Sequence, residues 1–315
     1  MARCADDGGG AQRGIRAVSR RWGRALAGLV QGFSAAQKPW RRAAIRLRTA
    51  QFLQQRIAVP TRYGDLVFVI DDPGELLHAR EFHIREPETL AWIDGFETPC
   101  RFWDVGANIG SFSLYGGRKP GVEVIAFEPA AANYLALCRN IDANGLSARV
   151  RALCLALSDR TELGDMNLSQ FSAGGVFNIF NSTEDCFGRQ LDVVARHGMV
   201  GFSIDEFRRV FGVPAPHYLK IDVDSVEEAI LAGSADTLRH RGLRSVLIEI
   251  EEAETARNAR LRQVLESCGF HLALRSPGGR GGAVNAIFTR DPVETAFVKP
   301  REAATASPAA PAGSA

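Results

Sequence analysis

The sequence predicts an α/β fold in which a mostly parallel β-sheet carries helices on both faces and ends in an antiparallel hairpin. Apolar runs alternate with segments of helical periodicity, and near-continuous apolar strands are typical of a parallel sheet covered on both sides. Near the carboxyl end, the runs 271–276 and 283–289 are joined only by PGGRGG. Because a parallel pair needs a crossover of about a dozen residues, these two runs should pair antiparallel.

Composition divides the chain into three regions. Apolar residues make up 46% and charged residues 23%, which fits a globular protein. The first 56 residues hold only two acids, Asp6 and Asp7, against a dozen lysines and arginines. We therefore expect a basic extension over 1–56, partly helical or disordered, one large domain over 57–299, and a disordered Ala/Pro/Ser-rich tail over 300–315. The domain is net acidic, so nucleic acid is not an expected partner.

The basic extension contains the pattern of an amphipathic helix. Apolar side chains recur on one helical stripe, at Trp22, Leu26, Leu29, Val30 and Phe33, and arginines flank this stripe. The simpler interpretation is a solvated extension, or one that docks on the core. The alternative is an interfacial helix that makes peripheral contact with an acidic membrane.

Several features of the sequence favour a cytoplasmic location. No uninterrupted apolar run reaches the roughly 18 residues that span a bilayer. The piece ALAGLV is shorter than the core of a secretory signal, which needs about 7–15 residues. The six cysteines are far apart without a C-x-x-C pair, which predicts reduced thiols and neither disulfides nor structural zinc.

Six apolar runs precede the hairpin as strand candidates: LVFVI (66–70), CRFWDV (100–105), VEVIAF (122–127), ARVRALCLALS (148–158), HYLKIDV (217–223) and RSVLIEI (244–250). Segments with a helical apolar face fill most of the gaps. The stretch 160–216 is an insertion between strands, and we expect it to form a lid or an acceptor pocket. Phe171, Phe177 and Phe180 would line that pocket or pack in the core.

A turn of small residues follows the second run, in FWDVGANIG (102–110). Gly106 would permit a tight turn and Gly110 a close approach of backbone N–H groups to a ligand, although an ordinary strand–helix turn also tolerates such glycines. The run does not match the G-x-G-x-x-G of NAD-binding folds. It resembles the D/E-x-G-x-G-x-G motif of S-adenosylmethionine (SAM) enzymes, with Asn108 in place of the middle glycine. Asp104 would then lie near the methionine amino group.

Polar residues also end the next two strand candidates. Glu128 follows Asp104 by 24 residues, about where nucleoside-binding folds place the acid that accepts hydrogen bonds from the ribose. This spacing suits NAD and SAM equally. Leu157, Ser158 and Asp159 would frame the adenine, although an ordinary turn or helix cap explains the Ser-Asp pair nearly as well.

Two aspartates mark the end of the fifth run, in LKIDVDSVEEAIL. A following helix N-terminus attracts acids, but it does not explain Asp222 inside an otherwise apolar strand. We expect Asp222 to face the crevice as the general base or as the group that orients the acceptor, with Asp224 as the second candidate base. His217 begins this strand, at the wrong end of the sheet. The other histidines are expected to be structural or superficial, although His83 and His197 would reach the site on loops.

Together these motifs resemble the FkbM family of SAM-dependent methyltransferases. The matching stretches, over residues 80 to 252, are F-x-D-V-G-A-N-I-G, F-E-P with Asn133 and Asn140, A-L-S-D, S-I-D-E-F, L-K-I-D-V-D and I-E-I. The resemblance implies a class I methyltransferase (Rossmann-like) fold with a seven-stranded sheet, SAM as cofactor, and O-methyl transfer to a hydroxyl of a sugar, glycan or other natural product. It adds Asn133 and, from REPETL (85–90), Glu86 to the candidate cofactor-binding residues.

One residue departs from the family's pattern. Ser225 stands where the family usually has glycine, which would allow close packing at the strand–helix turn. A serine there would be a harmless N-cap or would narrow the acceptor pocket.

Two functions from other classes remain open on the residues alone. A nicotinamide-dependent oxidoreductase would use Glu128 in the same way, and a non-catalytic module would keep the nucleoside pocket without turnover. Asp222, Asp224 and Glu249 offer the oxygen ligands that Mg²⁺ favours, but salt bridges explain Glu249 equally well, so we predict no metal. The acceptor is expected to be a small molecule or a glycan.

Overall fold

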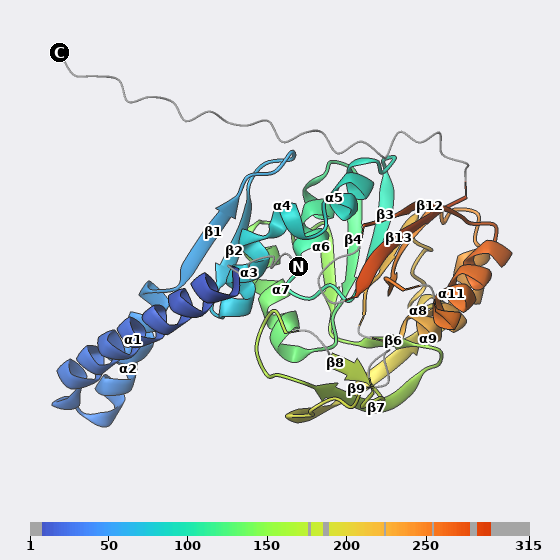
Figure 1. The fold of residues 1–315 in the computed structure, drawn as a ribbon. Helices are drawn as coiled ribbons and strands as arrows, with labels where there is room; N and C mark the ends of the chain where they lie inside the picture. The colour runs from blue at the N-terminus through green and yellow to red at the C-terminus, as the bar shows by residue number, and fades with distance from the viewer. Residues whose placement is uncertain are drawn as a thin grey trace, which may run out of the picture. The chain divides into compact units, whose positions relative to one another are not determined.

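The structure is a computed structural model that describes residues 8–175, 178–184, 189–223, 225–253, 255–277 and 282–290, with side chains from residue 21 onward (Figure 1). The chain divides into two compact units, residues 1–55 and 56–315. In the first unit, α1 (Gly8–Ala35) and α2 (Pro39–Phe52) form a helical hairpin, and α1 contains the amphipathic stripe. No helix in the described part of the chain is long and apolar enough to cross a membrane.

The second unit is built on a seven-stranded sheet. Its strands, in spatial order, are β12 (His271–Arg275), β13 (Ala283–Thr289), β11 (Ser245–Glu251), β10 (Tyr218–Ile221), β3 (Cys100–Val105), β4 (Val122–Phe127) and β5 (Val150–Leu153). The neighbours from β11 to β5 pair in parallel, whereas β13 runs antiparallel to both β11 and β12. The predicted mostly parallel sheet with a terminal antiparallel hairpin is therefore confirmed.

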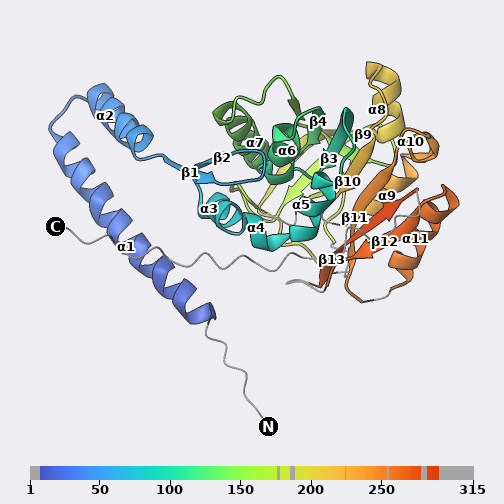
Figure 2. The ribbon, with the colours of Figure 1, turned by 90° about the horizontal axis from the view of Figure 1, so that it is seen from above.

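Helices cover both faces of this sheet (Figure 2). Consecutive residues of a strand point to opposite faces, so Phe102 packs into one core cluster with Trp92, and Trp103 packs into another with Phe207. The first face carries α3 (Pro73–Arg80), α4 (Phe82–Arg85), α5 (Pro87–Asp94), α6 (Ser111–Arg118) and α7 (Ala131–Ala143). The second carries α8 (Ile204–Phe211), α9 (Glu227–Ala232), α10 (Ala235–Arg239) and α11 (Ala256–Ser267).

The run 66–70 is a strand, β2 (Leu66–Ile70), but it lies outside the central sheet and pairs only with β1 (Gln55–Val59). Asn140 of α7 and Asn144, the C-cap of that helix, explain this placement. The Asn140 side chain accepts a hydrogen bond from the Val69 N–H at 2.9 Å, and Asn144 accepts from the Val67 N–H at 2.8 Å. These side chains satisfy backbone groups that a neighbouring strand would otherwise pair.

The run 148–158 is not one strand, as expected, but two. β5 ends at Leu153, whose carbonyl accepts from the Glu128 N–H. Every second residue of the partner strand donates to β5, so the next donor would be Ala130, whose N–H instead donates to the Glu128 side chain at 2.9 Å. β6 (Ala156–Ser158) instead joins a second sheet with β7 (Glu162–Leu168), β8 (Asn178–Phe180) and β9 (Ala195–Ser203), in the order β6-β9-β7-β8. The 160–216 insertion supplies most of this sheet, and α8 follows it. Ser203 caps α8, accepting from the Glu206 N–H at 3.2 Å.

Candidate active site

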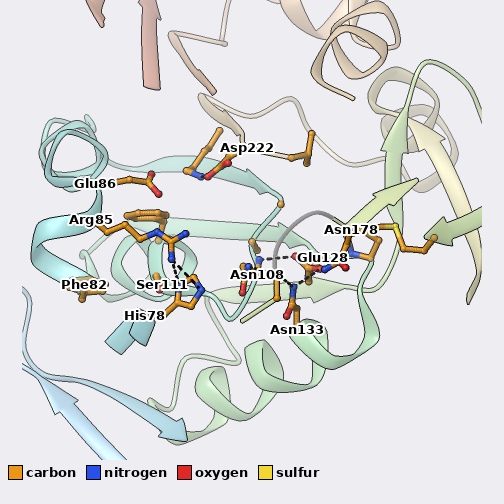
Figure 3. A pocket seen from close by; sticks show the side chains of 18 residues that line it. His78, Phe82, Arg85, Glu86, Asn108, Ser111, Glu128, Asn133, Asn178 and Asp222 are labelled. Carbon is orange, nitrogen blue, oxygen red and sulfur yellow. Dashed lines mark hydrogen bonds and ion pairs between the residues drawn. The ribbon is translucent and has the colours of Figure 1, made fainter. Parts of the chain in front are cut away.

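A cavity of about 120 Å³ opens at the carboxyl ends of β3, β4 and β10 (Figure 3). Side chains from four parts of the chain line it: the α3–α4 region, the loop after β3, the start of α7, and the end of β10. Met166 and Asn178 reach it from the second sheet. The cavity therefore lies where parallel α/β sheets bind ligands, at the edge formed by strand carboxyl ends.

The loop after β3 takes a left-handed backbone conformation at every second residue. The φ angles are 83° at Gly106, 51° at Asn108 and 94° at Gly110. Gly110 does not line the cavity, so the expected close approach to a ligand was wrong at this residue. A Cβ there would instead come within 2.4 Å of the Leu137 side chain of α7. Asparagine is among the few non-glycine residues that adopt positive φ. Asn108 therefore meets the same backbone requirement as the glycine it replaces.

Glu128 lines the cavity at the end of β4, and its side chain is held by the loop. Oε2 accepts from the Asn108 N–H at 2.8 Å, and Oε1 accepts from the Ala130 N–H at 2.9 Å and from the Asn133 amide at 3.4 Å. Glu128 is only 5% exposed. These bonds fix a carboxylate at the position that the sequence assigns to a nucleoside.

Two asparagines bind a segment of the 160–216 insertion to this site. The amide groups of Asn108 and Asn133 both donate to the Gly175 carbonyl at 3.1 Å. The Asn133 side-chain oxygen accepts from the Gly174 N–H at 2.9 Å. Residues 174–175 are thus tied to the cavity wall by side chains from the loop and from α7.

A buried lysine that we did not select from the sequence lies beside Asp222. Lys220 is 1% exposed, and its ammonium forms an ion pair with the Asp222 carboxylate and lies 5.0 Å from the ring centroid of Phe112. Burial lowers the pKa of Lys220, but the negative charges of Asp222, Glu86 and Asp104 raise it by more, to above its ordinary value. The lysine is therefore charged, and Asp222 lines the cavity as expected.

Glu86 also lines the cavity, where one of its carboxylate oxygens is fixed. Oε2 accepts from the Thr89 hydroxyl at 3.0 Å and from the Asn285 amide of β13 at 3.1 Å. Oε1 has no hydrogen bond with the described residues. Burial raises the pKa of Glu86, and the charge of Asp222 raises it further, against the opposing effect of Lys220. Glu86 thus holds a proton more readily than an ordinary glutamate.

Asp104 lies behind the cavity and not on its wall. It is fully buried, its Oδ2 accepts from the Ser113 hydroxyl at 2.5 Å, and its Oδ1 has no hydrogen bond within the described residues. Burial raises its pKa, although Lys220 opposes this effect. In this structure the acid faces Lys220 and the first turn of α6.

Arg85 and His78 form a pair on the cavity wall that sequence reasoning missed. The Arg85 Nη1 lies 3.3 Å and 3.4 Å from the two ring nitrogens of His78 (Figure 3). Burial, helped by the Arg85 charge, lowers the pKa of His78 to about 4, so the imidazole is neutral at pH 7. Arg85 forms no ion pair with a carboxylate of the described residues. No local motif signals this pair, because both residues precede the glycine loop on surface helices.

The other sequence candidates are spread over several places. Leu157 lines a smaller, mostly apolar cavity that shares Gly106, Met166 and Asn178 with the first. Ser158 and Asp159 line neither cavity. Asp224 and Phe177 lie outside the described residues.

The remaining histidines and aromatic residues have structural partners. His83 contacts the Pro60 carbonyl at 2.8 Å, His197 packs against Phe171, and Phe180 lies in the core of the second sheet. Within the described residues, no group of three or more His, Cys, Asp or Glu side chains is arranged to hold a metal ion.

The strand order, with β13 antiparallel and the glycine loop after β3, defines a class I methyltransferase (Rossmann-like) fold. The Methyltransferase FkbM domain matches residues 104–272, which is more than half of the chain. The chain belongs to the FkbM methyltransferase family. It is thus a SAM-dependent methyltransferase, which decides against the nicotinamide-dependent alternative.

The chain is also similar to individual proteins. Methyltransferase sdnD of Sordaria araneosa is 29% identical over 193 residues, covering 54% of this chain and 73% of that protein. The 31-O-demethyl-FK506 methyltransferase FkbM of Streptomyces tacrolimicus is 27% identical over 179 residues, covering 49% and 66%. Among solved structures, Aeropyrum pernix fibrillarin in complex with SAM is 9% identical, with a TM-score of 0.43 over 74% of this chain and 82% of that one.

The cavity residues fit SAM. Three carboxylates, on Glu86, Glu128 and Asp222, line it and complement the positive charge of a sulfonium. The smaller apolar cavity beside Gly106 suits a flat base.

Proposed function

We propose that the protein methylates a hydroxyl group of a sugar, a glycan or another natural product. The observation that supports this most directly is the pair of carboxylates, Glu86 and Asp222, on the cavity wall around Lys220. A hydroxyl acceptor must lose its proton, and an accessible carboxylate can take it. The relative from Streptomyces tacrolimicus, named for methylation at the 31-oxygen of FK506, supports the same chemistry.

We propose that SAM, the methyl donor, binds in the two neighbouring cavities. Glu128 would accept hydrogen bonds from the ribose hydroxyls, with Gly106, Asn108, Gly110 and Asn133 shaping its surroundings. Leu157, which lines the smaller cavity, would pack against the adenine. Asp104 would not contact SAM directly, and its negative charge would help to keep Lys220 protonated.

The carboxylate of the donor needs a cation, and Arg85 supplies it in this proposal. Lys220 is already neutralised by Asp222, Glu86 and Asp104, and His78 is uncharged at pH 7. Among the described residues that line the cavity, Arg85 is the remaining cation that can pair with this carboxylate. Ser111, the first residue of α6, lines the same cavity, so the positive end of this helix would add to the attraction.

SAM supplies a methyl group that is already activated by the sulfonium. The protein therefore contributes alignment, which can be worth about 7–11 kcal/mol, and removal of the proton. We assign Asp222, fixed by Lys220, to orient the acceptor, and Glu86, whose pKa is raised, to receive the proton. Asp224 remains the second aspartate candidate. The 160–216 insertion would cover the acceptor, because residues 174–175 are bound to the cavity wall.

Methyl transfer with ¹³C-methyl SAM tests the proposal. Extracts and panels of hydroxylated sugars and natural products would be incubated with the enzyme, and the labelled product located by mass spectrometry and NMR. We expect the label on oxygen, and we expect Glu86→Gln to lose turnover while calorimetry still detects SAM binding. A label on nitrogen or carbon would contradict the acceptor class. SAM binding without any transfer would favour the non-catalytic alternative.

We also propose that the protein is located in the cytoplasm. Cys100, Cys138, Cys154 and Cys268 are free thiols, which supports a reducing, cytoplasmic environment.

A further inference from the structure

One face of α1 exposes a row of large apolar side chains. Trp22 is 69% exposed, Leu26 57%, Leu29 59% and Phe33 84%. At about 100° per residue these four positions form a single stripe along the helix. Arg21 and Arg24 fall on the opposite half. Single exposed apolar residues are common, but an aligned row on one helix marks an interaction surface.

α2 is held against α1 by two arginine side chains. The Arg42 guanidinium donates to the Ala35 carbonyl at 2.5 Å, which satisfies the carboxyl end of α1. The Arg46 Nε donates to the buried Ser34 hydroxyl at 3.1 Å. Trp40, Leu47 and Phe52 of α2 are also exposed. The two helices therefore act as one hairpin.

The charge of this hairpin has a single sign. Residues 8–53 contain ten arginines and lysines and no aspartate or glutamate, and the next acid in the chain is Asp65. The net charge of this segment is therefore strongly positive, which favours an anionic partner. We propose that the α1–α2 hairpin binds the surface of a membrane that contains anionic lipids, with the apolar stripe of α1 among the acyl chains and the arginines at the headgroups.

The apolar row favours lipid over nucleic acid as the anionic partner. Phosphate backbones are bound by cations and polar groups, and they give no burial to Leu26, Leu29 or Phe33. A lipid surface meets both requirements at once, because it presents anionic headgroups above an apolar layer. The proposal is independent of the acceptor assigned above.

Vesicle binding by the full chain tests the proposal. Sedimentation would compare vesicles of phosphatidylcholine alone with vesicles of phosphatidylcholine and phosphatidylglycerol. We expect binding to the anionic vesicles, weakened by salt, with a shift of tryptophan fluorescence to shorter wavelength. Trp92 and Trp103 are buried, so this shift reports Trp22 and Trp40. Arg21→Gln with Arg24→Gln should lower binding about 30-fold, and Leu26→Ser with Phe33→Ser should lower it at least as much.

Matched substitutions outside the hairpin control for general loss of surface apolarity or charge. Leu163→Ser removes an exposed leucine of β7, and Arg241→Gln removes an exposed arginine. Both should bind vesicles like the unaltered protein, and all variants should keep SAM affinity. Equal binding to both vesicle types, or full binding by the Leu26/Phe33 variant, would overturn the proposal. So would salt-sensitive binding to an oligonucleotide, or self-association through the hairpin, in the absence of vesicle binding.

Discussion

Gly106 and Asp222 approach so closely that a Cβ atom on Gly106 would lie 1.8 Å from the Asp222 carbonyl oxygen. The two residues follow neighbouring parallel strands, β3 and β10, whose pairing ends at Val105 and Ile221. The contact fixes the glycine loop against the strand end that carries Asp222. A shift of this loop would therefore be felt at the backbone of Asp222.

Replacing Gly106 by alanine should disrupt this contact. The new Cβ meets backbone atoms that cannot rotate away, and φ is +83°, so we expect unfolding free energy to fall by about 3 kcal/mol or more. Denaturant unfolding measures this. Gly145→Ala is the control, because Gly145 has φ +63° but nothing within 4 Å of a Cβ, and it should cost only about 1 kcal/mol. Equal losses in the two variants would show that the close approach is unimportant.

Ser225 carries backbone strain that glycine would relieve. Its φ is +85°, a region that glycine adopts freely and serine rarely does. The expectation that Ser225 is an N-cap was wrong, because the N-cap of α9 is Val226. The positive φ is an explanation for the family's glycine that the sequence did not suggest. Ser225→Gly should raise the unfolding free energy by about 0.5–1 kcal/mol, after the entropy that glycine adds to the unfolded chain.

Thermal and denaturant unfolding of Ser225→Gly and Ser225→Ala separate backbone from side chain. The Ser225→Ala variant keeps a side chain at a residue with positive φ, and so keeps the backbone strain, but it lacks the hydroxyl group. A stabilising glycine together with a neutral or destabilising alanine would support strain. If alanine stabilised as much as glycine, the hydroxyl would be the unfavourable group.

The sheet and the loop were predictable because their signals are local. Apolar runs, the short PGGRGG connection and the spacing from Asp104 to Glu128 are each contained in one segment of sequence. The placement of β2 was not predictable, since it depends on Asn140 and Asn144 of a helix far along the chain. The split of 148–158 was not predictable either, because the Ala130 N–H that would continue the ladder donates to the Glu128 side chain.

The site was predictable where a motif marks it and not where packing creates it. Lys220 could have been found, because a charged residue in a buried strand needs a partner and parallel pairing sets it opposite Asp104. Arg85 and His78 could not, because α3 and α4 reach the cavity through tertiary packing alone. Asn108 illustrates the reverse case, where an apparent departure from a glycine motif preserves its backbone conformation.

The pH dependence of methyl transfer should report the environment of Glu86. Its pKa lies above the ordinary value because of burial and Asp222, so the proton-accepting form increases as pH rises through that higher pKa. Activity should therefore rise with pH, with a midpoint above the roughly 4.3 of an ordinary glutamate. Asp222→Asn removes a charge that raises this pKa, so the rise should move to lower pH.

Profiles of kcat/KM against pH check this expectation. Glu86→Gln should abolish the rise and lower turnover about 10²–10⁴-fold. Glu97→Gln, which removes an exposed carboxylate far from the cavity wall, should leave the profile unchanged. A rise that persists in Glu86→Gln would assign the proton acceptor to another group.

Arg85 should recognise the carboxylate of the methyl donor and nothing else of that molecule. Decarboxylated SAM keeps the sulfonium, the amine and the nucleoside, so it isolates this one interaction. In the unaltered protein we expect decarboxylated SAM to bind about tenfold more weakly than SAM, the usual loss for a charged hydrogen bond. Arg85→Gln should lose the same factor toward SAM and almost none toward decarboxylated SAM, as measured by calorimetry.

Arg80→Gln is the matched control, because Arg80 is an exposed arginine that pairs with Glu81 and does not line the cavity. It should bind both donors normally. If Arg85→Gln weakened both donors equally, the guanidinium would shape the cavity without contacting the carboxylate. If it left both unchanged but raised KM for the acceptor, Arg85 would belong to the acceptor site, which would then have to be anionic. Comparison of the two donors in the two variants thus decides which substrate this cation serves.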